Sequence, residues 1–530
     1  MSGPSYSSRM IRMPRAIDWK PLILLAALVV AVTAWRVSQA QQSLWLDELH
    51  TAWSAGGELS EVAPRAAAGN QPPFYFWLLW GELRLVPPSE LAFRGPSLVA
   101  GALLMAAVYF IAARWLGSPW FGLLAAWIIA LEQGANHYAV EARSYALVTL
   151  LATAHVALFA ELCRRPGWKL RAAFIVGAAL LFHLHFTSAL VFPAELLFWF
   201  VARVRRLMPV RYTVRQLTLD LALIGVLWLP AARTIGGVFG RRHNWEAFIP
   251  QEPFWHFLFW LSWSMAALWV LAAVLVDRYA VELPRIRSNS PDAGGPSPEA
   301  IRLRTFAILC LLWLLVPLTL AWLTTSLNLA RLFFARYVVA AAPAAILLAA
   351  TCARLAPSKP ARVFVGLLLA GAALWINQSL PVREQEDWRG AVDWLNEKLQ
   401  QQPLPVLVFS DLIEDQGLRE PHDPSFEDFC LFPVAAIYRV NAPRGDLLPL
   451  PSHGTGLLNS NQRLWLRERG GAWVIVRTKE LTRANASAEA VAAEVSADSP
   501  SGPLWGLKDN LRGERVHVVR IGPRAQTIEP

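Results

Sequence analysis

The sequence predicts an α-helical polytopic membrane protein with about eleven transmembrane helices and a small C-terminal α/β domain outside the cytoplasm. Of its 530 residues, 55% are hydrophobic and 17% are charged, with 25 Trp and 25 Phe. This composition is more apolar than that of a soluble domain. Apolar runs of spanning length recur as far as residue 380. The composition then becomes polar over residues 381–530.

The first apolar run covers residues 21–37 and follows a polar stretch, residues 1–20, with scattered basic side chains. A signal peptide has the same layout, and Ser38-Gln39-Ala40 resembles a weak cleavage site. Because many further apolar segments follow, we interpret the run as a retained helix with residues 1–20 in the cytoplasm.

Ten further segments complete the predicted transmembrane domain, residues 21–380. They cover residues 96–114, 119–135, 143–162, 171–188, 189–203, 216–233, 254–276, 304–326, 337–356 and 361–380. With the N-terminus inside, most Arg and Lys fall in inner loops, in agreement with the positive-inside rule. Residues 286–300 are rich in Pro, Gly and Ser and are interpreted as a flexible inner loop.

An odd number of spans places residues 381–530 outside the membrane as a soluble domain. Residues 388–395 favour an amphipathic helix. Three runs favour strands, at residues 404–409, 472–477 and 515–521. Together they predict an α/β domain.

The sequence argues against several classes of function. The net charge is +10, but basic residues lie between apolar runs and not in one patch with aromatics, so we expect no nucleic-acid partner. The four cysteines lack metal-ligand spacing. There is no Walker-type loop for an ATP-driven pump. There is also no fixed-period repeat, which disfavours a transporter built from inverted halves.

The first outer loop, residues 38–95, is longer than a connector needs to be, and such loops are often functional. It contains Asp47, Glu48 and His50 within Trp-Leu-Asp-Glu-Leu-His-Thr, directly after the first span. Adjacent carboxylates near hydrocarbon are costly unless they are paired, hydrated or functional. The alternative is that they only begin a surface helix, favoured by the helix dipole.

The same loop contains Pro72, Pro73 and Tyr75, followed by further aromatic residues. The two prolines predict an extended segment, and the aromatic run is expected in the headgroup zone. The alternative is an interfacial anchor without a chemical role.

A second polar motif, residues 136–145, precedes a later span on the same outer side. Arg143 could hold a phosphate through its planar fork of donors. Glu141 could be a metal ligand or an orienting carboxylate. The alternative is a Glu–Arg pair that only ends a helix.

Two further motifs reach the outer side. His183 and His185 are two residues apart and do not share a helix face, so they do not form a metal site by themselves. His185 could face an outer cavity or be a buried, satisfied histidine. Arg336, followed by Tyr337, suits an anionic lipid head, or is a snorkelling anchor.

This combination suits transfer of a group from a lipid phosphate. Carboxylates can deprotonate an acceptor or hold a divalent metal, for which Mg²⁺, Mn²⁺ and Zn²⁺ are candidates, and arginines can neutralise a phosphate leaving group.

The set of motifs resembles the GT-C membrane glycosyltransferases, in particular bacterial enzymes similar to family 39 protein O-mannosyltransferases and to the aminoarabinose transferases of lipid A. The likeness covers about residues 20–395. It rests on Trp-Leu-Asp-Glu at 45–48, Asn-Gln-Pro-Pro-Phe-Tyr at 70–75, Ala-Arg-Ser-Tyr-Ala-Leu at 142–147, His-Leu-His-Phe-Thr-Ser at 183–188, Arg-Tyr at 336–337 and Asp-Trp-Arg-Gly-Ala at 387–391.

The resemblance implies a multi-pass protein of the bacterial inner membrane and a polyprenyl-phosphate sugar donor. It also implies outward-facing transfer with inversion to a lipid, glycan or protein acceptor. It makes Asp47 the general base beside Glu48, places Glu141 and Arg143 toward donor phosphate and metal, and puts His185, Arg336 and Tyr337 along the cavity. Two positions depart from the pattern: Gln71 replaces the usual histidine, and Glu141 replaces the commoner aspartate.

Two alternatives stay open. A flippase or transporter of polyprenyl-linked sugars would use the outer cavity for binding only, and an outer-face ligase would move whole oligosaccharides. The charged residues collect at the outer ends of spans and not at mid-membrane depth, which favours surface chemistry.

Overall fold

The computed structural model describes residues 18–242, 246, 249–260, 298–376, 386–410, 418, 424–451, 456–497, 504–511 and 515–524. The chain forms two compact units. We call them the helical unit, which comprises Met1–Ser38, Pro96–Val140 and Ser144–Pro381, and the mixed unit, which comprises Gln39–Gly95, Glu141–Arg143 and Val382–Pro530.

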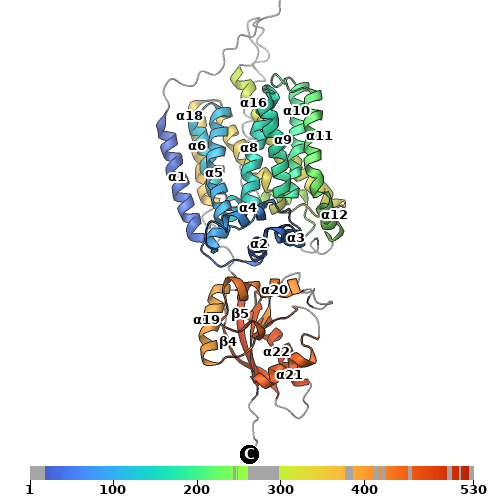
Figure 1. Cartoon of the computed structure of the whole chain (residues 1–530). Helices are drawn as coiled ribbons and strands as arrows, with labels where there is room; N and C mark the ends of the chain where they lie inside the picture. Colours follow the sequence, from blue (N-terminus) through green and yellow to red (C-terminus); the bar gives the residue numbers. More distant parts are fainter. Residues whose placement is uncertain are drawn as a thin grey trace, which may run out of the picture. The chain divides into compact units, whose positions relative to one another are not determined.

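Apolar helices run side by side through the helical unit (Figure 1). Among the described residues, seven helical stretches are long and apolar enough to cross a membrane. They are Trp19–Gln39 (α1), Glu90–Leu116 (α5), Tyr145–Arg164 (α8), Phe186–Val204 (η1 and α10), Val214–Gly240 (α11, η2 and α12), Pro298–Ser326 (α16) and Lys359–Ile376 (α18). Shorter helices are Pro119–Leu131 (α6), Gln133–Ala139 (α7), Trp168–Leu184 (α9) and Ala342–Leu355 (α17). Helices suit lipid because each satisfies its own backbone hydrogen bonds.

The predicted helical membrane class is therefore confirmed, and the number of spans stays a prediction. Helices occupy the predicted segments 21–37, 96–114 and 304–326. The predicted segment 254–276 lies outside the described residues from position 261 onward, as do residues 1–17 and most of the predicted loop 286–300.

Buried charged side chains in the helical unit are paired between helices. His155 Nδ1 in α8 lies 2.8 Å from Glu195 Oε1 in α10, and His155 Nε2 contacts the Phe174 carbonyl of α9 at 3.1 Å. Arg171 in α9 binds Asp220 in α11 at 2.6 Å. Because an ionisable group inside a membrane is costly unless it has a partner, these contacts fix neighbouring helices against each other.

Three short helices fold the first outer loop: Leu46–Gly56 (α2), Leu59–Ala68 (α3) and Phe74–Glu82 (α4). Pro73 precedes α4 with φ −80° and ψ −13°, and its carbonyl accepts a hydrogen bond from Trp77 N at 3.0 Å. The proline pair therefore leads into a helix, where an extended segment was expected. The fixed φ of proline suits a helix start as well as an extended chain.

The tail contains a five-stranded sheet in the order β2-β1-β3-β5-β4. The strands are Val406–Phe409 (β1), Leu447–Pro449 (β2), Ala472–Arg477 (β3), Trp505–Leu511 (β4) and Val516–Pro523 (β5). β1 pairs in parallel with β2 and β3, whereas β5 pairs antiparallel with β3 and β4. The predicted strands coincide with β1, β3 and β5, and the α/β class is confirmed.

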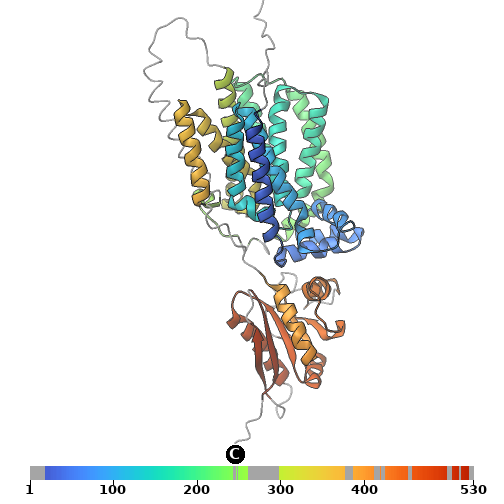
Figure 2. The same cartoon turned by 90° about the vertical axis from the view of Figure 1, so that its left-hand side faces the viewer.

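Helices cover both faces of this sheet (Figure 2). On one face, the ring of Trp394 in Trp388–Gln401 (α19) lies 5.6 Å from that of Trp473 in β3. On the other, Val474 and Val476 share a core with Val491 of Leu481–Ala497 (α22). The alternation of side chains along β3 explains both contacts. Ser460–Arg469 (α21) and Pro424–Phe432 (α20) complete the helices of the tail.

Within the mixed unit, the first outer loop packs against the tail. Leu44 N donates to the Tyr438 hydroxyl at 2.7 Å. Trp53 of α2 forms a buried cluster with Phe429 and Cys430 of α20. Two segments that the helical unit separates in the sequence therefore share one hydrophobic core.

Candidate active site

Helix α2 begins directly before the two adjacent carboxylates. Trp45 is extended, with φ −94° and ψ 173°, and the helix starts at Leu46. Glu48 Oε2 accepts a hydrogen bond from Trp45 N at 3.2 Å. Asp47 and Glu48 lie in the first turn, where the positive end of the helix dipole favours negative charge. The two carboxylates do begin a helix, and their surroundings distinguish their roles.

Glu48 forms a buried ion pair with Arg94, which lies in the first turns of α5. Arg94 Nε donates to Glu48 Oε1 at 2.8 Å and Nη2 donates to Oε2 at 2.6 Å. Both side chains are 0% exposed. Two parallel charge-assisted hydrogen bonds make this a strong and geometrically specific contact.

Arg94 also organises the chain that precedes α2. Its Nη1 donates to the carbonyls of Ala40 at 2.8 Å and Gln42 at 2.6 Å, and its Nη2 donates to that of Ser43 at 3.1 Å. Loss of the Arg94 side chain would therefore release both the segment 40–43 and the start of α2. This geometry fits a positioning role for Glu48.

The turn at residues 141–143 meets the first turn of α2. Ala142 N donates to Glu48 Oε1 at 2.7 Å. Arg143 Nη1 donates to the Asp47 carbonyl at 3.2 Å, and Nη2 lies 3.6 Å from Asp47 Oδ2. Arg143 Nη1 also lies 3.5 Å from Thr51 Oγ1. The structure thus brings together Asp47, Glu48 and Arg143 from two distant predicted motifs.

Asp47 differs from Glu48 in its access to solvent. The Asp47 side chain is 25% exposed, and that of Arg143 is 8% exposed. Asp47 is therefore the carboxylate of the pair that a substrate can reach, and it lies beside a guanidinium suited to phosphate.

His50 lies in the interior of the loop fold. Its ring centroid is 6.0 Å from that of Trp53 and 5.7 Å from that of Phe429, and Nε2 lies 3.1 Å from the Arg65 carbonyl oxygen. Burial and the positive charge of Arg143 lower the pKa of His50 to about 4. The ring is therefore neutral at pH 7 and packs as an aromatic side chain.

The remaining predicted residues of the loop and turn are also buried. Pro72, Tyr75 and Glu141 are all buried, and the Tyr75 ring packs edge-on against Phe76 at 5.8 Å. Pro73 sets the start of α4, which packs against α2. The Pro-Pro-Phe-Tyr motif therefore supports the helix that carries Asp47.

Three other predicted residues are neighbours in the helical unit. The ring centroid of His185 lies 5.4 Å from that of Tyr145 and 5.9 Å from that of Tyr337. Thr187 Oγ1 hydrogen-bonds His185 Nδ1 at 2.8 Å. The Arg336 guanidinium lies 5.5 Å from the centre of the Tyr337 ring. His185, Arg336 and Tyr337 therefore form one polar and aromatic cluster.

The described residues do not provide a recognisable metal site. No group of three His, Cys, Asp or Glu side chains among them is placed to hold a metal ion. The Glu48 carboxylate accepts hydrogen bonds from Arg94 and from the N–H groups of Trp45 and Ala142. Glu48 therefore has little remaining capacity to bind a divalent ion.

Two residues outside the predicted set, Arg94 and Glu386, hold the site in place. The sequence motifs do not include Arg94, although an arginine beside hydrocarbon is costly unless it is paired. Glu386 is 1% exposed. Its Oε2 accepts from Leu46 N at 3.1 Å and from Trp388 Nε1 at 3.2 Å, and its Oε1 accepts from Arg477 at 2.7 Å. Its position beside the Asp-Trp-Arg-Gly-Ala motif was the available signal.

Comparisons with known proteins agree with this architecture. Residues 70–229 match a family model described as dolichyl-phosphate-mannose-protein mannosyltransferase. No curated protein matches the sequence. ArnT from Cupriavidus metallidurans bound to undecaprenyl phosphate matches with a TM-score of 0.51 and 11% identity, over 95% of this chain and 98% of that one.

An oligosaccharyltransferase from Archaeoglobus fulgidus, solved in complex with Zn and sulfate, matches with a TM-score of 0.46 and 11% identity. The match covers 91% of this chain and 70% of that one. The likeness to ArnT establishes the fold, and the family model adds an independent match over residues 70–229. The chain is therefore a multi-pass membrane protein with the GT-C glycosyltransferase fold, similar to the protein mannosyltransferases and to ArnT.

Proposed function

We propose that this protein transfers a sugar from a polyprenyl-phosphate donor to an acceptor hydroxyl at the outer face of the bacterial inner membrane, with Asp47 as the general base. The N-terminus would lie in the cytoplasm and the C-terminal domain outside it. The known binding of undecaprenyl phosphate by ArnT supports this choice of donor.

One observation carries the proposal, the contrast between two adjacent carboxylates. Glu48 is fully buried against Arg94, whereas Asp47 is 25% exposed and lies 3.6 Å from the Arg143 guanidinium. A reactive carboxylate needs access to its substrate, and a phosphate leaving group needs a nearby cation. The first turn of α2 offers the accessible carboxylate, and Arg143 beside it offers the cation.

The proposed reaction is a direct displacement at the anomeric carbon. The acceptor oxygen forms a bond to C1 from the face opposite the phosphate, and the bond from C1 to the phosphate oxygen breaks. Asp47 takes the acceptor proton. The donor phosphodiester leaves as polyprenyl phosphate, and its added negative charge is stabilised by Arg143.

The roles of the other predicted residues follow from this reaction. Arg336 and Tyr337 are proposed to contact the donor phosphate, and His185 to line the donor cavity. Glu48 is proposed to hold Asp47 in position and not to exchange a proton, because both of its oxygens are bound to Arg94.

The test is transfer of radiolabelled sugar in membranes from a panel of hexosyl and pentosyl polyprenyl phosphates. Losing a general base costs about 10²–10⁴-fold, so Asp47→Asn should lower turnover by that factor. Asp393→Asn provides a matched control, because Asp393 is an exposed aspartate of α19 outside the site. It should transfer label at the wild-type rate.

Wild-type turnover by Asp47→Asn would overturn the assignment of the base. Label that stays on the donor in wild type, although the protein still binds it, would indicate a flippase or transporter. Transfer of preassembled glycans alone would indicate a ligase. A parallel reaction with EDTA decides whether a divalent metal takes part.

A further inference from the structure

The C-terminal domain contains a cavity of about 340 Å³ that the proposed reaction does not use. It lies between the edge strand β2 and the first turns of α21. Its lining residues are Gly445, Leu447, Leu448, Asn459, Asn461, Gln462 and Trp465. This volume is within the range of about 300–1,000 Å³ that is typical of small-molecule sites. The lining combines one indole, three carboxamides and two leucines.

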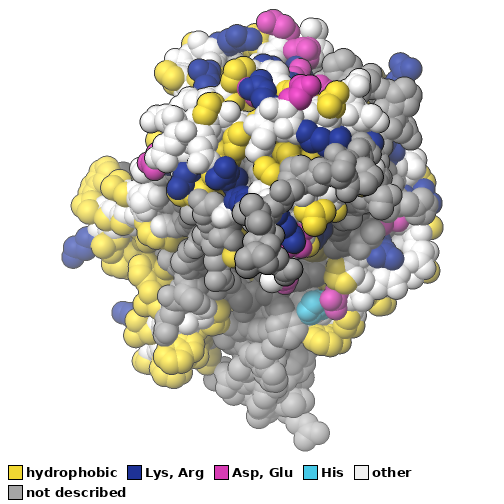
Figure 3. Space-filling view, turned by 90° about the horizontal axis from the view of Figure 1, so that it is seen from below, with side chains coloured by type: hydrophobic (Ala, Val, Ile, Leu, Met, Phe, Trp, Pro, Cys, Tyr) yellow, Lys and Arg dark blue, Asp and Glu magenta, His cyan; other side chains and the backbone are white. Residues whose placement is uncertain are grey.

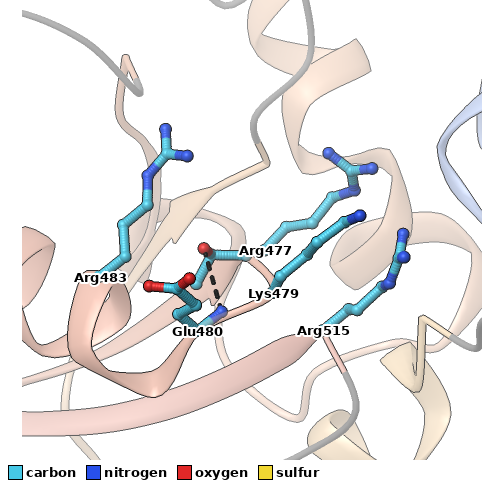
Figure 4. A pocket seen from close by; sticks show the side chains of 6 residues that line it. Arg477, Lys479, Glu480, Arg483 and Arg515 are labelled. Carbon is cyan, nitrogen blue, oxygen red and sulfur yellow. Dashed lines mark hydrogen bonds between the residues drawn. The ribbon is translucent and has the colours of Figure 1, made fainter.

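No side chain of this lining carries a charge. Other parts of the surface are charged: on the face seen in Figure 3, both basic and acidic side chains are exposed. A different cavity of the same domain, at the end of β3, is lined by Arg477, Lys479, Glu480 and Arg483 among others (Figure 4). Because a charged ligand needs a compensating partner when it leaves water, the uncharged lining favours a neutral ligand.

Helix α21 presents its polar and aromatic side chains to the cavity from one side. Asn461 and Trp465 are four residues apart and Gln462 precedes Trp465 by three, so the three side chains are neighbours on the helix surface. The partly buried Trp465 packs against the hydrophobic core of the domain and also lines the cavity. The core therefore holds one part of the indole in place while another part borders the cavity.

The start of α21 fixes two of the carboxamides before a ligand binds. Asn459 Oδ1 accepts from Gln462 N at 2.9 Å, and Gln462 Oε1 accepts from Asn459 N at 2.8 Å. Among the described residues, Asn459 Nδ2 and Gln462 Nε2 have no hydrogen-bond partner, so both remain available as donors. Side chains that are already held in place lose little freedom on binding.

The lining matches the chemistry of a sugar ring. A sugar hydroxyl both donates and accepts hydrogen bonds, and the exposed carboxamide of Asn461 can do the same. The face of an indole carries partial negative charge. The C–H groups on one side of a pyranose ring carry partial positive charge, so such a ring can stack on Trp465. The cavity therefore offers the two kinds of contact that a neutral sugar makes.

Other neutral ligands fit this place less well. A peptide could pair with the sheet edge, but β2 has only three residues, and Pro449 has no N–H to donate to an added strand. A wholly apolar ligand would cover the three carboxamides without hydrogen-bonding them, which is costly. A polyhydroxylated ring meets neither difficulty.

We infer that this cavity binds a neutral sugar unit of a glycan. The binding goes beyond the proposed transfer and depends on none of its catalytic residues. Such a site would retain a glycan acceptor on the mixed unit, which also contains Asp47. Only this role in transfer rests on the proposed function.

The test is saturation-transfer difference NMR on the purified full-length protein in a detergent without a sugar headgroup. The neutral probes are the trisaccharides maltotriose, cellotriose, mannotriose and chitotriose, and the charged probe is trigalacturonic acid. We expect saturable binding of at least one neutral probe and weaker binding of trigalacturonic acid. Binding of no neutral probe, or tighter binding of trigalacturonic acid than of every neutral probe, would overturn the inference.

A substitution of an exposed side chain locates the binding. Asn461→Ala removes one carboxamide of the lining and should lower the affinity for the bound probe about fivefold, the effect of one lost hydrogen bond. Asn441→Ala is the matched control, because Asn441 is an exposed asparagine of the same domain outside the cavity. It should bind as wild type does. Wild-type affinity in Asn461→Ala, or an equal loss in Asn441→Ala, would contradict a site in this cavity.

The indole is tested separately. Trp465→Ala removes the stacking surface and should weaken binding about tenfold or more. Because Trp465 also packs against the core, thermal unfolding of the variant is measured in parallel. Trp465→Phe keeps an aromatic ring and should regain part of the affinity. A folded Trp465→Ala protein with wild-type affinity would refute the stacking contact and with it the sugar site.

The proposed function can fail separately. Wild-type protein that binds a neutral trisaccharide but transfers no sugar would refute the transferase and leave the cavity as a glycan site. Protein that transfers sugar but binds none of the neutral probes would refute the cavity alone.

Discussion

The start of α2 and the cavity at the end of β3 differ in how far their charged side chains are exposed. The cavity is lined by Arg477, Thr478, Lys479, Glu480, Arg483 and Arg515. At α2, the Glu48 carboxylate is buried and matched by one guanidinium with two hydrogen bonds. In the cavity, by contrast, Lys479, Glu480 and Arg483 are exposed. Both regions are polar, but the charges of the first are buried and those of the second lie at the surface.

The difference indicates two kinds of role. A buried, fully matched pair contributes geometry, because separating the charges would leave one of them without compensation in a low-dielectric environment. Exposed charges, in contrast, contribute little to stability, because water and salt screen them. We therefore expect substitutions at the Glu48–Arg94 pair to destabilise the fold far more than substitutions of the exposed charges of the cavity.

The largest expected effect on stability is at the buried pair. Arg94→Ala should lower the free energy of unfolding by about 3–5 kcal/mol, because it leaves the Glu48 charge buried without its partner. Thermal unfolding of the purified protein in detergent measures this. Arg84→Ala, which removes an exposed arginine of the same loop, should change stability by less than about 0.5 kcal/mol. Similar losses in both variants would contradict a specific role for the pair.

A somewhat smaller effect is expected from pH. The pKa of His50 is about 4 when folded and 6.5 ordinarily. Between these values the unfolded chain binds more protons than the folded one. The contribution of His50 to the free energy of unfolding is therefore fully present above pH 6.5 and is lost as the pH decreases from 6.5 to 4. The full effect is about 3 kcal/mol.

This pH dependence can be separated from that of the carboxylates by substitution. His50→Gln keeps a side-chain donor near the Arg65 carbonyl but does not titrate. Its melting temperature should fall less than that of wild type between pH 6.5 and 4. Identical pH profiles would show that His50 is not held neutral by its surroundings.

The smallest expected effect on stability is in the cavity. Lys479→Ala and Arg483→Ala should change the free energy of unfolding by no more than about 0.5 kcal/mol. Any change in the free energy of unfolding that these substitutions cause should be smaller at high salt, because ions screen the interactions of exposed charges. Melting temperatures at low and high salt measure this. A loss above about 2 kcal/mol in either variant would show that the cations hold the fold together and would erase the contrast with α2.

Sequence patterns were sufficient to predict which long segments form membrane helices and which short ones form the central strands. Long apolar runs predict membrane helices such as α1 and α16, since each helix satisfies its own backbone and needs no distant partner. The runs that became β1, β3 and β5 were equally visible, whereas β2 and β4 were missed. β2 has only three residues, and β4 contains Gly506, Lys508 and Asp509, which interrupt its apolar pattern. Such edge strands carry little hydrophobic signal.

By itself, the sequence determined the membrane-helical class, the α/β tail and the polar motifs that contain Asp47 and Arg143. Only the tertiary structure decided that Asp47 is exposed while Glu48 is bound by Arg94, that His50 packs among aromatic rings, and that the first loop and the tail share a core. It also decided that Glu386 connects Leu46 with Arg477. The physical reason is that periodicity and composition report local preferences, whereas burial and ion pairing depend on which distant residues meet when the chain folds.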